Sequence, residues 1–238
     1  MIIKGIQKTS LVDYPGKIVA TIFLGGCNFQ CHYCHNPELV DPAIVNESEN
    51  ISEDEILELL KEKMKYIDGV CITGGEPTIH EDLPNFIKRI KNVCTGFVVK
   101  LDTNGTNPKM LLELIEKKLI DYVAMDIKAP LNKYEQITNC TLRKDNIIES
   151  VEILKQNKNN ICYEFRTTVM REFIKNKDLI EIGEWLKGSK RYAIQQFSFD
   201  QKMLNSNYQE SIPYDPEELN KMADLIKDCF DEVIVRGV

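Results

Sequence analysis

Three cysteines and two histidines fall within fourteen residues of the sequence, in the stretch GGCNFQCHYCHNPE. The cysteines are Cys27, Cys31 and Cys34, and their spacing is C-x3-C-x2-C. Three thiolates on one short loop can bind three of the four irons of a cubane iron–sulfur cluster. Because no fourth cysteine is near them in the sequence, the fourth iron would stay open to a small molecule, as one position of a catalytic zinc does.

A zinc ion is the competing interpretation, in which His32 or His35 adds a fourth ligand to the three thiolates. Zinc fingers usually pair two C-x2-C knuckles, or one such knuckle with a distant pair of histidines. This chain has one C-x2-C, and its only other histidine is His80. The spacing therefore favours a cluster and leaves zinc open.

The composition is typical of a globular protein that stays in the cytoplasm, without a membrane or nucleic-acid partner. No apolar run reaches the roughly 18–20 residues of a membrane span, and the N-terminus does not resemble a signal peptide. The net charge of −7 and the scattered Lys and Arg residues disfavour nucleic-acid binding. Cytoplasmic thiols stay reduced, so we expect the isolated cysteines to be small buried residues rather than disulfides. These are Cys71, Cys94, Cys140, Cys162 and Cys229.

Strand-like and helix-like segments alternate about six times along the chain, beginning with the apolar stretch of residues 17–25. This alternation predicts βαβ units and a parallel sheet, as either an open doubly wound sheet or a barrel. No linker rich in Gly, Ser or Pro divides the chain. We therefore expect one domain over residues 1–238, with a short extension at 1–16, a core at about 17–197 and a C-terminal segment at 198–238.

Polar residues follow the C-terminal ends of the predicted strands. In both architectures, this edge of the sheet is where functional residues gather. Six strands that each bring polar groups to one edge of the sheet indicate a functional site more strongly than any single motif does. The groups are the cysteine loop, GGEP at 74–77, DTNG at 102–105, Asp126 with Lys128, Arg166, and Gln195 with Gln196.

Two motifs resemble those of the radical S-adenosylmethionine superfamily. The cysteine spacing, with Tyr33 before the last cysteine, resembles its cluster signature, and GGEP resembles its S-adenosylmethionine-binding motif. The stretch Ser10 to Val40 is similar to activating enzymes of glycyl radical enzymes. It is closest to those of anaerobic ribonucleoside-triphosphate reductase and is related to pyruvate formate-lyase activase. DTNG and the D-x-K of Asp126 and Lys128 also resemble this group, and the match extends to about Gln196.

The resemblance implies a fold and a reaction. The fold is an α/β partial (β/α)6 barrel, and the cofactors are one [4Fe-4S] cluster on the three cysteines and S-adenosylmethionine. The reduced cluster would cleave S-adenosylmethionine to a 5′-deoxyadenosyl radical, which would abstract hydrogen from a backbone glycine of a partner glycyl radical enzyme. Anaerobic ribonucleoside-triphosphate reductase is the expected partner, and flavodoxin or ferredoxin is an expected electron donor.

The resemblance also implies cofactor contacts close to the cysteines. Gly74 and Gly75 would let the backbone approach S-adenosylmethionine, because a Cβ would obstruct it. Glu76 would face the ammonium group of the cofactor or make a structural hydrogen bond. Asn36 would contact the cofactor or form a simple turn before the next residue, a proline.

Charged residues at the later strand ends have two possible roles each. Asp102, Thr103 and Asp126 offer hard oxygen ligands for a cation near the cofactor, and Asp102 could instead form a turn. Lys128 and Arg166 would neutralise the cofactor carboxylate or form ion pairs with Asp126 and Glu164.

This chain departs from pyruvate formate-lyase activase at a late histidine that contacts the cofactor there. The sequence here reads AIQQF, so Gln196 could substitute for that histidine or the contact could be absent. We hypothesise that the long connection at 198–214 borders the opening through which the partner's glycine loop enters. In this interpretation His32 and His35 are neighbours of the cluster and not its ligands.

The sequence also allows other functions. The chain could be a pyruvate formate-lyase-type activase or a radical enzyme acting on a small molecule, such as the 7-carboxy-7-deazaguanine synthase group. It could also be a zinc-binding or electron-transfer module without catalysis. GGEP, DTNG and the polar rim argue against such a module, because it would not need them.

Overall fold

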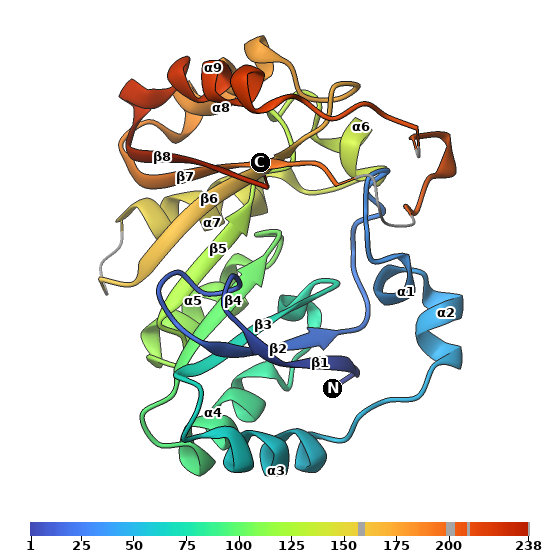
Figure 1. Ribbon diagram of the computed structural model, residues 1–238, viewed down its shortest axis with the longest axis vertical. Helices are drawn as coiled ribbons and strands as arrows, with labels where there is room; N and C mark the ends of the chain where they lie inside the picture. The colour runs from blue at the N-terminus through green and yellow to red at the C-terminus, as the bar shows by residue number, and fades with distance from the viewer. Residues whose placement is uncertain (157–159, 199–202, 209, 238) are drawn as a thin grey trace.

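The strands of the structure form one sheet in which they lie side by side in chain order (Figure 1). The computed structural model describes residues 1–156, 160–198, 203–208 and 210–237. β1 runs antiparallel to β2, and each later strand pairs in parallel with the one before it. The strands are β1 (Ile3–Ser10), β2 (Val19–Leu24), β3 (Gly69–Gly74), β4 (Val98–Thr103), β5 (Tyr122–Asp126), β6 (Cys162–Val169), β7 (Ser189–Gln196) and β8 (Phe230–Arg236).

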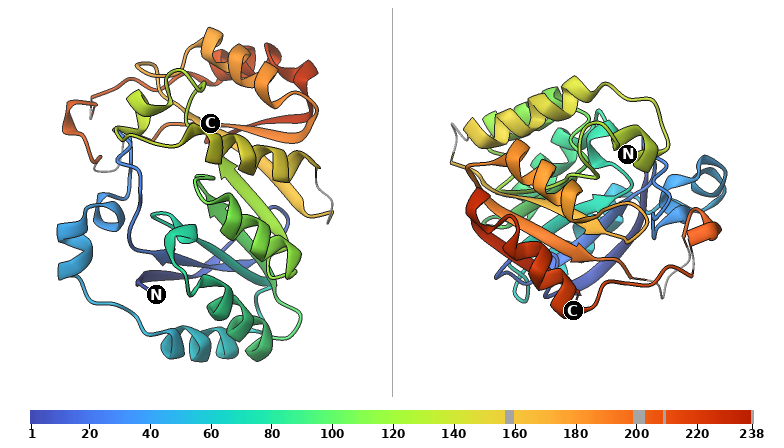
Figure 2. Two further views of the ribbon diagram at one scale, coloured as in Figure 1. Left: turned by 180° about the vertical axis from the view of Figure 1, so that it is seen from behind. Right: turned by 90° about the horizontal axis from the view of Figure 1, so that it is seen from above.

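Helices connect the strands, and α4, α5 and α7 cover the back of the sheet (Figure 2). None of the helices that the structure describes has the length and apolar character needed to cross a membrane. The helices are α1 (Pro37–Val40), α2 (Pro42–Glu47), α3 (Glu53–Lys63), α4 (Leu83–Val93), α5 (Pro108–Glu116), α6 (Tyr134–Thr138), α7 (Lys144–Gln156), α8 (Asn176–Leu186) and α9 (Pro216–Asp224), with short 3-10 turns η1 (Pro77–Ile79), η2 (Ser206–Tyr208) and η3 (Lys227–Cys229).

The start of α3 shows how local sequence sets these elements. The Ser52 hydroxyl accepts the backbone N–H of Glu55, and the Glu55 carboxylate accepts the backbone N–H of Ser52. This reciprocal pairing is a capping box. Leu60 faces the core and is fully buried, and the helix ends at Lys63.

The predicted parallel sheet is confirmed, and α1, α2, α6 and β1 were not predicted. α1, α2 and α6 lack a full helical period of apolar residues. β1 lies in the segment expected to be an N-terminal extension, and its sequence IKGIQKTS mixes polar residues with a glycine. These features weaken the strand pattern. The single-domain organisation over residues 1–238 stays a prediction.

The loop between β1 and β2 closes the end of the sheet where the parallel strands begin. The Ser10 hydroxyl accepts the backbone N–H of Asp13, and the Thr21 hydroxyl donates to the Asp13 carboxylate at 2.6 Å. The Tyr14 ring lies 5.4 Å from that of Tyr122. The SLVDYPG part of the similar stretch therefore supports the fold at the end opposite the strand ends that carry the motifs.

The five isolated cysteines differ in burial. Cys71 and Cys94 are buried, as predicted, while Cys140 and Cys229 are half-buried. Cys162 is exposed, and the prediction is wrong there. Cys162 is the first residue of β6, so it lies at the rim of the sheet instead of within it.

Gly69 permits close contact between β3 and β4. A Cβ at this position would lie 1.9 Å from the carbonyl oxygen of Val98, which the sheet register holds in place. We expect Gly69→Ala to lower the free energy of unfolding by about 3 kcal/mol in urea denaturation followed by circular dichroism. Gly5→Ala is the matched control, because its Cβ would meet only Phe23, at 3.8 Å. Equal stability of the two variants would contradict this packing.

Candidate active site

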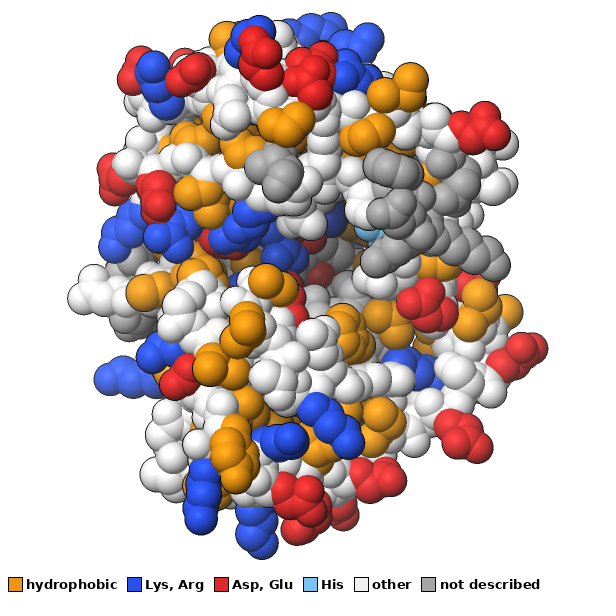
Figure 3. Space-filling view, in the orientation of Figure 1, with side chains coloured by type: hydrophobic (Ala, Val, Ile, Leu, Met, Phe, Trp, Pro, Cys, Tyr) orange, Lys and Arg blue, Asp and Glu red, His pale blue; other side chains and the backbone are white. Residues whose placement is uncertain are grey.

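A cavity of about 190 Å³ lies at the C-terminal ends of the parallel strands. In Figure 3 the molecule is hollowed between its upper and lower halves, with charged side chains of both signs inside the hollow. Gln196, which the sequence offered in place of a histidine, does not line this cavity, but twelve other residues predicted to act in the site do. They are Cys27, Cys31, Cys34, Asn36, Gly74, Gly75, Glu76, Asp102, Thr103, Asp126, Lys128 and Arg166.

The three cysteine thiols come from the loop between β2 and α1. The backbone N–H of Cys34 donates to the carbonyl of Cys31 at 3.0 Å, and that of Phe29 donates to the sulfur of Cys27 at 3.4 Å. Burial raises the pKa of Cys27 and Cys31 to about 12, and it also raises the pKa of Cys34. These groups are therefore neutral thiols at pH 7 unless a metal displaces their protons.

The surroundings of the cysteines favour a cluster over a single zinc ion. Among the described residues, no three Cys, His, Asp or Glu side chains converge closely enough to hold one metal ion. The side chain of His32 contacts that of Asn205 at 3.1 Å and stacks on Phe173, while the ring of His35 packs against Phe197. A cubane cluster holds each cysteine on a separate iron, so it suits thiols that share a cavity without converging on a point.

Glu76 is buried, and its carboxylate is bonded within the chain. It accepts hydrogen bonds from the backbone N–H and hydroxyl of Thr78, the hydroxyl of Thr103 and the backbone N–H of Asn104. Burial raises its pKa, and these hydrogen bonds oppose the rise. A carboxylate has about four acceptor positions, so little capacity is left for a cofactor ammonium group. Of the two roles left open by the sequence, this geometry supports the structural hydrogen bond.

Contacts within the chain explain the two glycines before Glu76. Gly74 has a φ of +122°, and a Cβ on Gly75 would lie 1.9 Å from the carbonyl oxygen of Gly26. The backbone N–H groups of Gly75 and Glu76 donate to the carbonyls of Leu24 and Gly26, both at 2.8 Å. The glycines therefore let the segment after β3 pack against the start of the cysteine loop, and their predicted role toward a cofactor stays a prediction.

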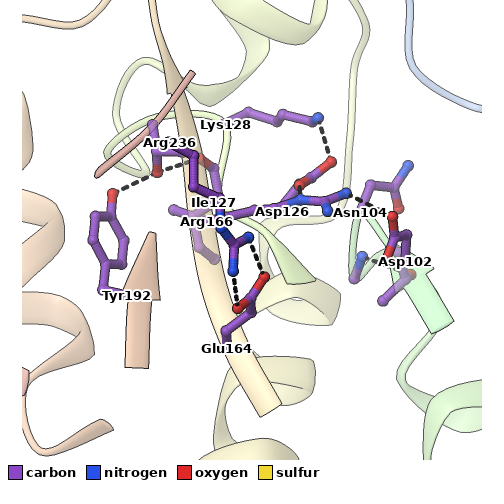
Figure 4. Close-up of polar contacts among 12 residues, drawn as sticks. Asp102, Asn104, Asp126, Ile127, Lys128, Glu164, Arg166, Tyr192 and Arg236 are labelled. Carbon is purple, nitrogen blue, oxygen red and sulfur yellow. Dashed lines mark hydrogen bonds and ion pairs between the residues drawn. The ribbon is translucent and has the colours of Figure 1, made fainter. Parts of the chain in front are cut away.

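Five charged residues form a connected group at the ends of β4, β5 and β6, here called the ionic rim (Figure 4). Arg166 contacts both carboxylates, with Nε on Asp126 and Nη2 at 3.1 Å from Asp102. Lys128 donates to Asp126 at 2.8 Å, and the buried Lys100 donates to Asp102. The rim links strands that are distant in the sequence.

The charges of the rim explain its pKa shifts, and the predicted cation site stays a prediction. Burial alone would raise the pKa of Asp102 and Asp126, but Arg166 outweighs it together with Lys100 and Lys128, so both pKa values lie below their usual range. The sequence suggested a bound cation near these carboxylates. In the structure the positive charges beside them are instead the chain's own ammonium and guanidinium groups.

Sequence reasoning missed Lys100 and Asn104, which also belong to this region. Lys100 lies two residues before Asp102 on the same face of β4, so strand alternation could have found it. Asn104 donates its side-chain N–H to Asn28 at 2.8 Å, and Asn28 donates to Thr106 at 2.7 Å. These amides connect DTNG to the residue that follows the first cysteine of the loop.

Gln195 lines the cavity, although the sequence singled out its neighbour Gln196 as a substitute for a histidine. Gln195 pairs in register with Thr168, which also lines the cavity. The side chain of Gln196 instead donates to the carbonyl of Tyr214. Successive side chains of a strand face opposite sides, so an error of one residue selects the wrong face.

Part of the long connection at 198–214 contacts the cysteine loop. Residues 199–202 and 209 lie outside the described residues. The contacts are two backbone hydrogen bonds, from Leu204 N–H to the Cys34 carbonyl at 3.0 Å and from Asn205 N–H to the His32 carbonyl at 3.2 Å. The described part therefore lies beside the cavity, and its role toward a partner stays a prediction.

Comparisons with known proteins identify the family of this chain. The model of the radical SAM superfamily matches residues 21–186. A glycyl-radical enzyme activating enzyme of Methanocaldococcus jannaschii is 35% identical over 242 aligned residues, which cover 100% of this chain and 96% of that protein. The pyruvate formate-lyase-activating enzyme of Clostridium pasteurianum is 33% identical over 132 residues, covering 53% of this chain and 52% of its own.

Among solved structures, Streptococcus suis SuiB bound to S-adenosylmethionine superposes with a TM-score of 0.66 at 16% identity. The match covers 89% of this chain and 48% of SuiB, so this chain spans about half the length of that protein. At this identity the likeness concerns the fold.

The chain belongs to the radical SAM superfamily and, within it, to the glycyl-radical enzyme activating enzymes. Its fold is the partial α/β barrel of that superfamily, and its cofactors are a [4Fe-4S] cluster and S-adenosylmethionine. Three thiols on one cavity, with Cys31 buried and the other two half-buried, fit such a cluster, and no fourth cysteine stands beside them on the loop.

Removing the central cation of the rim should destabilise the protein, most of all near neutral pH, where both rim carboxyls are charged. Carboxyls with a lowered pKa in the folded state add stability above their unfolded pKa of about 4 and lose it as the pH falls. Arg166→Gln should raise the pKa of both rim carboxyls. We expect it to lower the free energy of unfolding at pH 7 by about 3–5 kcal/mol, and to move the acid unfolding midpoint to higher pH.

Circular dichroism against pH measures this effect. The control is Arg89→Gln, because Arg89 pairs with Glu53 and Asp54 on the surface, where an ion pair adds little stability. An unchanged acid midpoint in Arg166→Gln would contradict the account of the rim.

Proposed function

We propose that this protein installs a glycyl radical on anaerobic ribonucleoside-triphosphate reductase. The observation that carries the proposal is the convergence of the three thiols, the segment after β3 and the ionic rim on one cavity. The relationship to a glycyl-radical enzyme activating enzyme along the whole chain supports it. S-adenosylmethionine on a reduced [4Fe-4S] cluster would supply the 5′-deoxyadenosyl radical, and a donor such as flavodoxin or ferredoxin would supply the electron.

The cysteine loop would hold the cluster and part of S-adenosylmethionine. Cys27, Cys31 and Cys34 would each bind one iron. Asn36 is the residue before α1, and its side chain does not cap that helix. Because the amide also lines the cavity, it is available for a cofactor contact, which favours this role over a simple turn.

The ionic rim would receive the methionyl carboxylate. Among the described residues it holds three cations (Lys100, Lys128 and Arg166) and two carboxylates (Asp102 and Asp126), which leaves one positive charge. A buried positive charge is favourable only with a partner, and a ligand carboxylate would provide one. Lys128 and Arg166 both line the cavity, so they are the cations that would meet it.

Gly74, Gly75, Glu76 and Thr103 would shape the wall without carrying charge to the cofactor. The Thr103 hydroxyl donates to Glu76, and the two glycines bring that carboxylate segment against the cysteine loop. These residues would hold the backbone after β3 at a fixed position beside the cluster.

Electron paramagnetic resonance tests the proposed function. The reduced, cluster-loaded protein is mixed anaerobically with S-adenosylmethionine and anaerobic ribonucleoside-triphosphate reductase, and we expect a glycyl radical doublet on the reductase. Cys31→Ser should abolish the doublet. Cys94→Ser is the matched control, because Cys94 is buried at the end of α4 and does not line the cavity, and it should retain the doublet.

Pyruvate formate-lyase is the comparison partner in the same experiment. A doublet on pyruvate formate-lyase and none on the reductase would overturn the choice of partner. Cleavage of S-adenosylmethionine without a doublet on either protein would contradict the proposed function and favour a small-molecule substrate.

A further inference from the structure

β1 and β8 are the two edge strands of the sheet, and the chain protects them unequally. An edge strand carries a row of unpaired backbone N–H and C=O groups that can pair with another chain, so proteins usually cover or interrupt such edges. β8 lies above the hollow of the molecule and β1 below it (Figures 1 and 3). An edge that is left open beside this hollow is therefore a candidate surface for a partner chain.

The edge of β1 is blunted in three ways. Its pairing with β2 has two register irregularities. The backbone N–H of Ile51 donates to the carbonyl of Ile3 at 2.9 Å, so a following segment covers part of the edge. The ammonium group of Lys4 donates to the carbonyl of Ser48 in the same segment at 2.6 Å. Bulges, lysines and a covering segment each prevent a further strand from pairing.

The edge of β8 has none of these features. The strand pairs with β7 in a parallel register without a shift, and its sequence FDEVIVR contains no proline, glycine or lysine. Among the described residues, no backbone hydrogen bond joins its other side to another segment. Val233, Ile234 and Val235 are half-buried, so an apolar run lies along an unpaired edge. Such an edge is a ready template for an added strand.

Arg236 and Glu232 of β8 are already paired within the chain. Arg236 donates to both oxygens of the fully buried Glu164, at 2.6 and 2.8 Å (Figure 4). Glu232 accepts a hydrogen bond from Arg191 at 2.6 Å. Between these two charged residues, positions 233–235 offer only apolar side chains. This chemistry fits an uncharged extended segment with apolar side chains, which gains affinity from the backbone hydrogen bonds of the edge.

The C-terminal end of β8 is level with the cavity of the active site. Arg236 pairs in register with Gln195, which lines that cavity. A segment paired with β8 would take the place of the next strand in the sheet, so the residues beside it in the partner's chain would reach the rim of the cavity. This continuity favours the protein substrate as the occupant, because the proposed reaction requires a backbone glycine of that protein to reach the cavity.

We propose that the outer edge of β8 pairs with an extended, uncharged segment of the protein substrate, next to the glycine that receives the radical. The added strand would use the unpaired N–H and C=O groups of β8 and pack its apolar side chains beside those of residues 233–235. The proposal rests on the proposed function in that the substrate is a protein with a reacting glycine. It does not depend on which glycyl radical enzyme supplies that glycine.

Hydrogen–deuterium exchange with mass spectrometry tests the proposal on the wild-type protein. The cluster-loaded protein with S-adenosylmethionine is measured anaerobically, alone and with anaerobic ribonucleoside-triphosphate reductase, or with pyruvate formate-lyase if the glycyl doublet forms there. We expect about tenfold slower exchange in peptic fragments that cover β8 when the substrate is bound, because the amides of the open edge become hydrogen-bonded. Fragments that cover β1 are the internal control and should exchange at an unchanged rate.

Two lysine substitutions give a matched pair of variants. Val233→Lys adds a charge to the open edge, and Ile6→Lys adds one at a half-buried position of the protected edge. We expect Val233→Lys to raise KM for the protein substrate about tenfold and to change kcat less than twofold, because a lysine disfavours the pairing of an edge strand. Ile6→Lys should keep the wild-type KM. Thermal unfolding and iron content are recorded for both variants.

The outcomes separate this proposal from the proposed function. A doublet on the substrate without slower exchange in β8, or equal KM values for the two variants, would overturn the edge of β8 as the docking site. Slow exchange in β8 of a wild-type dimer before substrate is added would assign the edge to a second copy of this chain and would also overturn it. No doublet on either protein would contradict the proposed function and, with it, this proposal.

Discussion

The geometry of the cavity depends on the guanidinium of Arg166. From β6 it contacts Asp126 at the end of β5 and Asp102 near the end of β4, so three neighbouring strands meet at one charge. All three side chains are largely shielded from water. Loss of one partner would leave buried charges uncompensated, which makes this pairing costly to disturb. The strand ends are therefore held in place by the chain itself.

Glu76 holds the loops of the cavity together, as Arg166 holds the strand ends together. Its carboxylate ties the segment after β3 to Thr103 and Asn104, and Asn104 reaches Asn28 on the cysteine loop. The thiols and the ionic rim are thus fixed in the wall of one cavity by separate polar networks. A cofactor bound between them would meet groups that are already oriented, which reduces the free energy spent on ordering the site.

The sequence predicted the parallel sheet and the set of cavity residues because both follow from topology, since parallel strands bring their C-terminal ends to one edge. It could not assign the partner of each charged group, because Arg166 pairs with Asp102 across strands far apart in the chain. Whether Gln195 or Gln196 faces the cavity depends on the side to which each strand residue points, and no motif in the sequence fixes that side.

The central claim is that S-adenosylmethionine binds the open iron of a three-cysteine cluster, with its methionyl carboxylate toward the ionic rim. Electron–nuclear double resonance of the reduced protein, with ¹⁷O in the carboxylate and ¹⁵N in the amino group of S-adenosylmethionine, tests it most directly. The account predicts hyperfine coupling of both labels to the cluster, weakened together with cofactor binding in Lys128→Met. Bound S-adenosylmethionine without coupling from either label would contradict it.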